Sequence, residues 1–316
     1  MAFHSGFVCI VGRPNAGKST LLNALAGEKL AIVSPKPQTT RTRVLGVIHV
    51  PKQKGKAGAQ VVLIDTPGVH RGWNSLSRKM LGEVREALDG CDLVLMIVDA
   101  ARKSEPADQF LLSLVKQSKT PAFLLLNKID LLRTQKHKLL PMIEQHAKQH
   151  NFQEVIPISA RRREGLDVLL QKLLAALPEG PRYFPEDQIT DQPARFMAAE
   201  LIREQLLFAT TEEVPHSVTV IVEQFDEGVK LTRIAAAIFC ERESQKGILI
   251  GRQGQMLKKV GTAARLEIER MLGTKVFLEL FVKVRANWRE SRAFVEELDW
   301  RKQLEHLVTT QTKPEA

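Results

Sequence analysis

The chain has 316 residues, which is too long for one small core and fits two domains of ordinary size. Hydrophobic residues make up 44% of it and charged residues 26%, close to the average of globular proteins, which excludes collagen-like, mucin-like and wholly disordered chains. The formal net charge of +10 favours a polyanionic partner.

The composition also predicts the compartment. No apolar run approaches the roughly 18 residues that a membrane-spanning helix needs, and the N-terminus leads almost directly into a strand-like segment without a signal peptide. Cys9, Cys91 and Cys240 are odd in number and lack metal-ligand spacing, so we expect buried thiols in a reducing compartment. We therefore expect a cytoplasmic protein.

The first 180 residues alternate between short apolar runs and longer amphipathic stretches. Strands are predicted at 7–11, 61–65, 93–99, 122–127 and 155–159, and helices at 18–26, 76–88, 106–117 and 166–177. This alternation is typical of an α/β fold built on a parallel sheet. A proline-rich segment beginning at Pro178 ends this part of the chain and is interpreted as a linker.

A phosphate-binding motif follows the first predicted strand. Residues 12–19 match G-x4-G-K-[ST], and they open the first predicted helix, as this motif requires. Backbone N–H groups of such a loop converge on phosphate oxygens, Lys18 would neutralise the β- and γ-phosphates, and the Ser19 hydroxyl would bind Mg²⁺. The candidate nucleotide contacts here are Gly12, Arg13, Pro14, Asn15, Ala16, Gly17, Lys18, Ser19 and Thr20.

A second motif, D-x-x-G, follows the strand predicted at 61–65. The Asp65 carboxylate can hold Mg²⁺ through water, and the Gly68 N–H can meet the γ-phosphate. The candidate contacts are Asp65, Thr66, Pro67 and Gly68. The next residue is Val69, where Ras-type enzymes carry the glutamine that orients water, so slow hydrolysis is expected. His70 is a weaker candidate for positioning water.

The motif N-K-x-D selects the base. Asn127, Lys128 and Asp130 come at the end of an apolar strand, where ligands lie in open α/β sheets. The Asp130 carboxylate can accept hydrogen bonds from N1–H and the exocyclic amine of guanine, and adenine lacks these donors in that arrangement. Ser159 and Ala160 end the following strand, where a backbone N–H can reach the guanine O6. Together these motifs predict a guanine nucleotide site.

Beyond the linker the pattern changes to a smaller α+β module. A helix is predicted at 193–208, strands at 217–225 and 229–240, a short helix before Ile250, a long helix at 255–272 and a strand at 275–284. The charge here is uneven, because residues 186–241 carry 4 basic and 11 acidic side chains whereas residues 244–289 carry 10 and 3. A basic face of this kind is either a solvated surface or a nucleic-acid contact.

A G-x-x-G loop lies between the two helices of this basic region. Its surroundings resemble a KH domain, whose G-x-x-G loop clamps the backbone of about four nucleotides. The candidate RNA contacts are Ile250, Gly251, Arg252, Gln253, Gly254, Lys258 and Lys259. Further candidate phosphate contacts are Lys275, Lys283, Arg285 and Arg289, and Trp288 could stack on a base, although packing against the terminal helix is the simpler role.

With these motifs in order, the first 180 residues resemble a GTPase domain of the translation-factor-related class. The whole chain resembles the Era family of bacterial GTPases, on Q-T-T-R at 38–41, D-T-P-G at 65–68, the segment at 184–187 and the downstream module. The resemblance implies that Thr40 is the switch threonine that reaches Mg²⁺, with Thr39 as a rival. It also implies that Asn15 can bind a K⁺ ion in place of an arginine finger, so that Lys18, Thr40 and Asn15 act in catalysis.

The resemblance further implies a phosphate-loop GTPase domain at residues 1–180, a linker at 181–192, a type II KH domain with a C-terminal helix at 193–308 and a tail at 309–316. It implies a monomeric GTPase that uses Mg²⁺, binds 16S rRNA near its 3′ end, acts in assembly of the small (30S) ribosomal subunit and can associate peripherally with the inner membrane. A phosphate-loop kinase is disfavoured by N-K-x-D. An RNA-modifying or other RNA-binding GTPase, and a GTP-gated binding module with negligible turnover, are alternatives.

Overall fold

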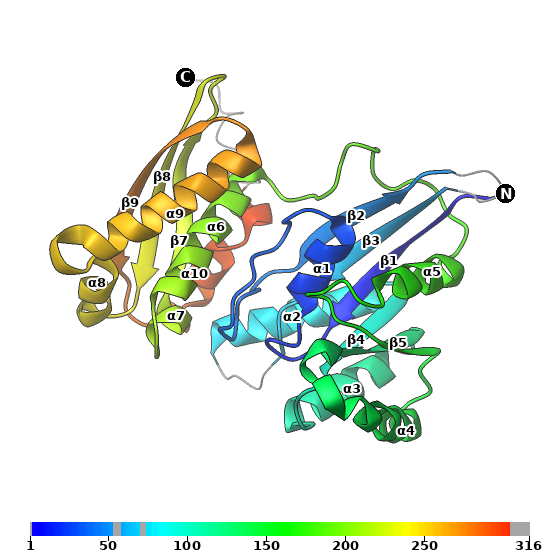
Figure 1. Ribbon diagram of the computed structural model, residues 1–316. Coiled ribbons are helices and arrows are strands. Elements are labelled where there is room, and N and C mark those ends of the chain that lie inside the picture. Colours follow the sequence, from blue (N-terminus) through cyan, green and yellow to red (C-terminus); the bar gives the residue numbers. More distant parts are fainter. Residues whose placement is uncertain (1, 53–57, 70–73, 304–316) are drawn as a thin grey trace. The chain divides into compact units, whose positions relative to one another are not determined.

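The computed structural model describes residues 2–52, 58–69 and 74–303, and its chain divides into two compact units. The first unit comprises Met1–Arg71 and Met80–Asp191, and the second comprises Gly72–Lys79 and Gln192–Ala316. Each unit has its own sheet (Figure 1), so each is described by itself. The tail expected at 309–316 lies outside the described residues.

A six-stranded sheet forms the centre of the first unit. Its strand order is β2-β3-β1-β4-β5-β6, and all neighbours are parallel except β2 and β3. The strands are β1 (His4–Val11), β2 (Val44–Val50), β3 (Ala59–Asp65), β4 (Leu93–Asp99), β5 (Ala122–Asn127) and β6 (Glu154–Pro157). β3, β4 and β5 are buried along their whole length, because helices cover both faces of the sheet.

Helices cover the two faces of this sheet. They are α1 (Lys18–Ala26), α2 (Ser75–Asp89), α3 (Pro106–Ser118), α4 (Leu139–Gln149) and α5 (Leu166–Ala176), with short 3₁₀ turns η1 (Ile129–Leu131) and η2 (Arg133–Lys138) before α4. One apolar cluster joins α1 and α5 to one face, and a second joins α2, α3 and α4 to the other. The predicted α/β class is confirmed, and the motifs follow the carboxyl ends of β1, β3, β5 and β6.

The second unit is an α+β module around a three-stranded sheet. Its sheet has the order β7-β8-β9, with β7 (Thr219–Asp226) antiparallel and β9 (Lys275–Val284) parallel to β8 (Leu231–Cys240). The helices are α6 (Ala194–Ala209), α7 (Val214–Ser217), α8 (Glu243–Ile250), α9 (Gln255–Leu272) and α10 (Arg292–Glu297), with η3 (Arg252–Gly254) between α8 and α9. α8, η3 and α9 are the predicted helix-turn-helix around G-x-x-G.

The structure contains elements that the sequence did not predict, and it places the expected linker segment against the first unit. β2 was not predicted, and it pairs along its length with β3 as the edge strand of the sheet. α4 was also not predicted, and it follows a run of charged residues that does not mark a helix start. The segment expected as a linker groups with the first unit as far as Asp191, because the Gln60 side chain donates to the Phe184 carbonyl and Thr190 Oγ1 donates to the Leu45 carbonyl.

The described part of the chain contains neither a membrane-spanning helix nor a cluster of metal-binding side chains. None of its helices is long and apolar enough to span a membrane. Within residues 2–52, 58–69 and 74–303, no group of three or more His, Cys, Asp or Glu side chains is arranged to hold a metal ion.

Candidate nucleotide and nucleic-acid sites

The phosphate-binding loop lies between β1 and α1, at the carboxyl end of the sheet. Gly17 has a φ of +105°, and a Cβ at this position would lie 2.2 Å from the Asn127 Nδ2 atom. A side chain there would therefore be both strained and in collision, so the turn requires glycine. The buried Lys18 ammonium donates to the carbonyl oxygens of Gly12 and Arg13, both at 3.1 Å.

Three side-chain oxygens meet next to this lysine. Ser19 Oγ donates to Asp65 Oδ2 at 2.6 Å and lies 2.9 Å from Thr40 Oγ1, which donates to the same carboxylate at 3.4 Å. The Thr39 hydroxyl instead donates to the Lys36 carbonyl at 2.7 Å. The structure thus brings Thr40, rather than Thr39, to Ser19 and Asp65.

These oxygens suit Mg²⁺, which prefers hard oxygen ligands and keeps several of its waters. Among the described residues, none forms a hydrogen bond with the buried Asp65 Oδ1, which suits an acceptor for a metal-bound water. Burial raises the pKa of Asp65 to about 6 and lowers that of Lys18 to about 8, while attraction between the two opposes both shifts. Their mutual attraction favours the charged form of both groups, which binding of a metal and a phosphate requires.

The D-x-x-G loop closes over the phosphate-binding loop. Thr66 Oγ1 donates to the Ile10 carbonyl at 2.8 Å, which fixes the start of the loop to β1. A Cβ on Gly68 would lie 2.8 Å from the backbone of Pro14, so only glycine permits this approach. Val69 is buried and apolar. His70 lies outside the described residues.

The N-K-x-D motif holds the phosphate-binding loop by its carbonyl groups. Asn127 Nδ2 donates to the Ala16 carbonyl at 2.8 Å, and Lys128 Nζ donates to the Asn15 carbonyl at 2.6 Å. The Ala160 N–H donates to Asn127 Oδ1 at 2.9 Å. Asn127 and Lys128 thus act on the loop, Ala160 holds Asn127, and the contact of a backbone N–H of Ser159-Ala160 with the guanine O6 stays a prediction.

Asp130, the last residue of this motif, lies in the 3₁₀ turn η1 after β5. Ser159 Oγ donates to its Oδ1 at 2.6 Å, and the Arg162 guanidinium lies 3.9 Å from its Oδ2. A hollow of about 300 Å³ opens beside the carboxylate. It is lined by Asp130, Leu131, Arg133, Arg161 and Arg162. Asp130 thus lines this hollow, and its side chain is 9% exposed. Thr20 is half-buried in the first turn of α1, and no described contact assigns it a role.

In the second unit, the G-x-x-G loop is a tight turn between α8 and α9. Gly251 has a φ of +74°, and a Cβ there would lie 2.6 Å from the Met256 Cβ, so the turn requires glycine. Arg252, Gln253, Lys258 and Lys259 are exposed around it, whereas Ile250 is half-buried. The predicted RNA contacts that carry charge therefore share one exposed region.

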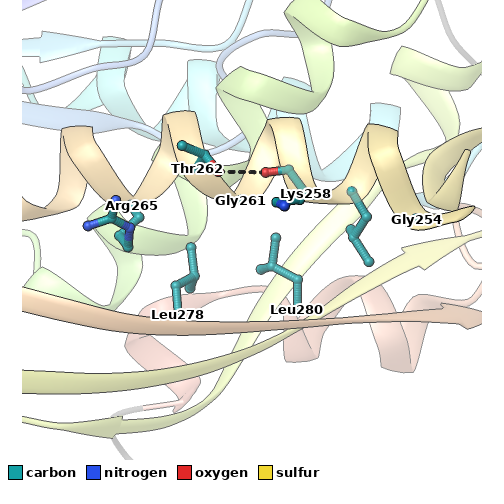
Figure 2. Close-up of a pocket in the computed structure, with 8 residues that line it drawn as sticks. Gly254, Lys258, Gly261, Thr262, Arg265, Leu278 and Leu280 are labelled. Atoms are coloured by element: carbon teal, nitrogen blue, oxygen red, sulfur yellow. Dashed lines mark hydrogen bonds between the residues drawn. The ribbon is translucent and has the colours of Figure 1, made fainter.

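A groove of about 390 Å³ runs from this loop between α9 and β9 (Figure 2). It is lined by Gly254, Leu257, Lys258, Gly261, Thr262, Arg265, Leu278 and Leu280. Leu278 and Leu280 point from β9 towards α9, and Gly261 leaves room above them. Of these residues, sequence reasoning selected only Gly254 and Lys258 as contacts. The alternation of β9 marks Leu278 and Leu280 as one face, but only the tertiary structure shows that this face borders a groove.

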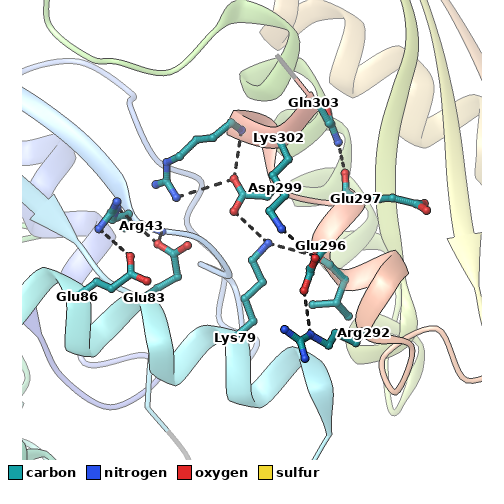
Figure 3. A network of polar contacts seen from close by, with 12 residues as sticks. Arg43, Lys79, Glu83, Glu86, Arg292, Glu296, Glu297, Asp299, Lys302 and Gln303 are labelled. Atoms are coloured by element: carbon teal, nitrogen blue, oxygen red, sulfur yellow. Dashed lines mark hydrogen bonds and ion pairs between the residues drawn. The ribbon is translucent and has the colours of Figure 1, made fainter. Parts of the chain in front are cut away.

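The four further candidate cations, Lys275, Lys283, Arg285 and Arg289, are each paired with a carboxylate of the same unit; Arg285 lies 3.7 Å from Glu297. Lys283 lies 2.5 Å from Glu223, Arg289 2.5 Å from Glu241, and Lys275 3.7 Å from Glu269. Ion pairs of this kind continue along the C-terminal helix, where Arg292 and Lys302 both contact Glu296 (Figure 3). These cations are less available for phosphate than those beside G-x-x-G. Trp288 is fully buried, and its Nε1 donates to the Ser217 carbonyl at 2.7 Å, so it packs in the core.

Comparison with known proteins covers both units. Residues 7–128 match the family described as 50S ribosome-binding GTPase, and residues 213–289 match the KH domain family. The chain is 47% identical over 300 residues to GTPase Era of Syntrophus aciditrophicus (strain SB), which covers 94% of this chain and 95% of that protein. It is 48% identical over 300 residues to GTPase Era of Geobacter metallireducens, which covers 94% and 98%. The chain belongs to the Era family of GTPases.

Solved Era structures match both units. A crystal structure of Era in complex with MgGDPNP and nucleotides 1506–1542 of 16S ribosomal RNA has a TM-score of 0.89 and 40% identity, and covers 94% of this chain and 99% of that one. A crystal structure of a single-residue variant of Aquifex aeolicus Era bound to GDP·AlF₄⁻ gives the same values. The predicted phosphate-loop GTPase fold followed by a type II KH fold is confirmed for this Era-family chain. Its individual site residues stay predictions.

Proposed function

We propose that this chain is a GTP-hydrolysing ribosome assembly factor that binds 16S rRNA near its 3′ end and acts in biogenesis of the small (30S) subunit. The observation that carries the enzymatic part is the meeting of Ser19, Thr40 and Asp65 beside Lys18, in the unit that also holds N-K-x-D. Family membership supports it, since the relatives are named GTPases. An Era structure that holds MgGDPNP and a 16S rRNA fragment supports the partners.

Each group in the nucleotide site has one task. Backbone N–H groups of residues 12–19 and the Lys18 ammonium bind the phosphates, and the Gly68 N–H meets the γ-phosphate. Ser19, Thr40 and Asp65 would hold Mg²⁺, the last through water; when bound, the metal neutralises charge on the phosphate oxygens. Asp130 selects guanine. Together these groups position GTP for in-line attack by water, which yields GDP and phosphate.

Hydrolysis by the chain alone is slow in this proposal. An attacking water needs a polar group to orient it, and the side chain that follows Gly68 is the apolar, buried Val69. Transition-state charge must then be neutralised by another group.

The groove between α9 and β9 supports the RNA part of the proposal. Its apolar floor suits the face of an unstacked base, and the exposed Lys258 at its rim suits the phosphate backbone. The two glycines of the G-x-x-G turn have no side chains, so the protein backbone there can approach the RNA backbone closely. These features favour single-stranded RNA over a duplex.

Turnover and RNA binding test the two parts separately. Lys18→Ala should lower GTP hydrolysis roughly a hundredfold or more, because the phosphates lose a buried positive charge. Lys116→Ala, at an exposed lysine on α3, is the matched control and should leave turnover unchanged. Filter binding should favour a fragment from the 16S rRNA 3′ end over a scrambled fragment of equal length. Native protein that binds GTP without turnover would instead be a GTP-gated binding module.

We further propose that K⁺ at Asn15 supplies the missing transition-state charge. Asn15 Nδ2 donates to the Pro35 carbonyl at 2.7 Å, so the amide lies against the segment that leads to Thr40. An amide oxygen and backbone carbonyls in this position are suitable ligands for a hard cation.

The salt dependence of turnover tests this proposal. GTP hydrolysis should be at least several-fold faster in KCl than in NaCl of equal ionic strength, and Asn15→Ala should abolish the difference. Equal rates of the native protein in both salts would contradict a role for K⁺.

The remaining parts of the proposal rest on the family resemblance. We propose a cytoplasmic monomer with peripheral contact to the inner membrane, and domain limits at residues 1–180, 181–192 and 193–308. Light scattering would test the monomer, and co-flotation with anionic lipid vesicles would test the membrane contact. Limited proteolysis would test the limits.

A further inference from the structure

The side chain of Arg13, the second residue of the phosphate-binding loop, points away from solvent. Only 4% of Arg13 is exposed. Its Nη1 atom lies 2.6 Å from the Glu105 carboxylate and 3.5 Å from the Asp108 carboxylate. Glu105 immediately precedes α3 and Asp108 lies in its first turn. The loop is thus joined through one guanidinium to the beginning of α3.

The two carboxylates form a fixed receptor for this guanidinium. Asp108 Oδ2 accepts a hydrogen bond from the Glu105 backbone N–H at 2.9 Å, and Asp108 is only 2% exposed. Within the described part of the chain, Arg13 Nη1 and Nη2 make no aligned hydrogen bond, so the attraction is mainly ionic. Arg13 and Asp108 are both buried, so moving the guanidinium away would leave a buried charge with less compensation, which is unfavourable. Arg13 is therefore held in place.

The same loop is held at other points by the N-K-x-D motif. Lys128 holds the Asn15 carbonyl and Asn127 holds the Ala16 carbonyl. These contacts restrain the middle of the loop, whereas Arg13 restrains its beginning, directly after Gly12. Because the phosphate ligands of this loop are backbone N–H groups, their directions depend on where the loop is anchored.

We propose that Arg13 is a positioning residue, clamped by Glu105 and Asp108, that orients the phosphate-binding loop and does not act as an arginine finger. The proposal rests on the GTP site proposed above. It adds two residues to that site, Glu105 at the N-cap of α3 and Asp108 in the first turn of α3. An arginine finger must bring its charge to the transferring phosphoryl group. The charge of Arg13 already faces two carboxylates, and moving it would leave the buried Asp108 without its arginine partner.

Glu105→Gln is the most informative variant, because the side chain of Glu105 is 56% exposed and its ion pair with Arg13 is its link to the loop. It should weaken binding of fluorescent GDP and GTP analogues alike by about fivefold, while kcat at saturating GTP stays within about twofold. Asp167→Asn is the matched control, because Asp167 is an exposed carboxylate in the first turn of another helix, α5. It should change neither quantity.

A double-mutant cycle tests the clamp itself. Arg13→Met should weaken the binding of both GDP and GTP analogues. Adding Glu105→Gln to Arg13→Met should weaken their binding little further. Thermal melting without nucleotide shows whether each variant is folded at the assay temperature. If Arg13→Met does not fold, Arg13→Lys replaces it, since it keeps the charge and loses the planar fork.

Several outcomes would overturn the inference. A tenfold loss of kcat with unchanged affinity in the Arg13 variant would show that Arg13 acts on the transition state. Unchanged affinity in both the Arg13 and the Glu105 variants, or a lowered melting temperature with unchanged affinity, would show that the clamp only stabilises the fold. If the native protein binds no guanine nucleotide, the proposed function and this inference both fail. If the native protein binds nucleotide and the variants bind it with the same affinity, only this inference fails.

Discussion

Single residues in the nucleotide site gain their roles from neighbours that lie far away in the sequence. Asp130 is an example. Its Oδ1 accepts a hydrogen bond from Ser159, 29 residues further along the chain, and this contact aims the carboxylate. A carboxylate accepts hydrogen bonds and cannot donate them, which matches two neighbouring donors on guanine.

The variant Asp130→Asn tests this role. An amide offers one acceptor and one donor, so GTP binding should weaken by at least tenfold, about 1.4 kcal/mol. Affinity for xanthosine triphosphate, whose 2-oxo group accepts a hydrogen bond, should rise. Competition against fluorescent GDP measures both nucleotides on one preparation. GTP affinity equal to that of the native protein would mean that Asp130 does not read the base.

Among the elements, α9 must be a stable helix and must also leave room for the groove at Gly261, and these two requirements oppose each other. It is an 18-residue helix with apolar residues towards the core, and one side of it borders the groove. Gly261 lies in its interior, where glycine costs about 1 kcal/mol relative to alanine. A Cβ at Gly261 would lie 3.2 Å from Leu280 Cδ1, so even a methyl group narrows the groove.

Gly261→Ala should therefore lower RNA affinity without lowering the stability of the second unit. The free energy of unfolding of the second unit should rise or stay unchanged, because helix propensity improves by up to about 1 kcal/mol. Affinity for the 16S rRNA 3′ fragment should fall several-fold. Ala263→Gly, in the same helix but absent from the groove lining, is the control and should lower stability without a specific loss of RNA affinity. Unchanged RNA affinity in Gly261→Ala would exclude this part of the groove from the RNA contact.

At the scale of the whole molecule, the two candidate sites belong to different units. The nucleotide motifs lie in the first unit, and the G-x-x-G loop with its groove lies in the second. Each unit has its own sheet, so a substitution on the surface of one unit should leave the site of the other intact.

The double variant Arg252→Asp with Gln253→Asp uses this separation. Both side chains are exposed and the glycines of the turn remain, so the fold should be kept. RNA affinity should fall at least tenfold, about 1.4 kcal/mol, because carboxylates repel the phosphate backbone, and its salt dependence should become less steep. Affinity for GDP should stay within about twofold. Native RNA affinity in the variant would mean that this loop is only a turn.

The sequence alone determined the fold class and the kind of each site. Phosphate binding by 12–19 depends on backbone N–H groups of one short segment, and a glycine pattern between a strand and a helix encodes that segment locally. The same holds for the G-x-x-G turn, where Gly251 and Gly254 take positive φ angles that glycine adopts without strain.

The tertiary structure decided what depends on contacts between distant segments. It placed Thr40 rather than Thr39 beside Ser19 and Asp65, because the path of the chain before β2 brings one hydroxyl to that carboxylate and leaves its neighbour on the Lys36 carbonyl. It paired Arg13 with Glu105, 92 positions later in the chain, and it brought α9 and β9 together into a groove. No local pattern encodes such pairs, because they arise only when the packing of helices on a sheet brings those side chains together.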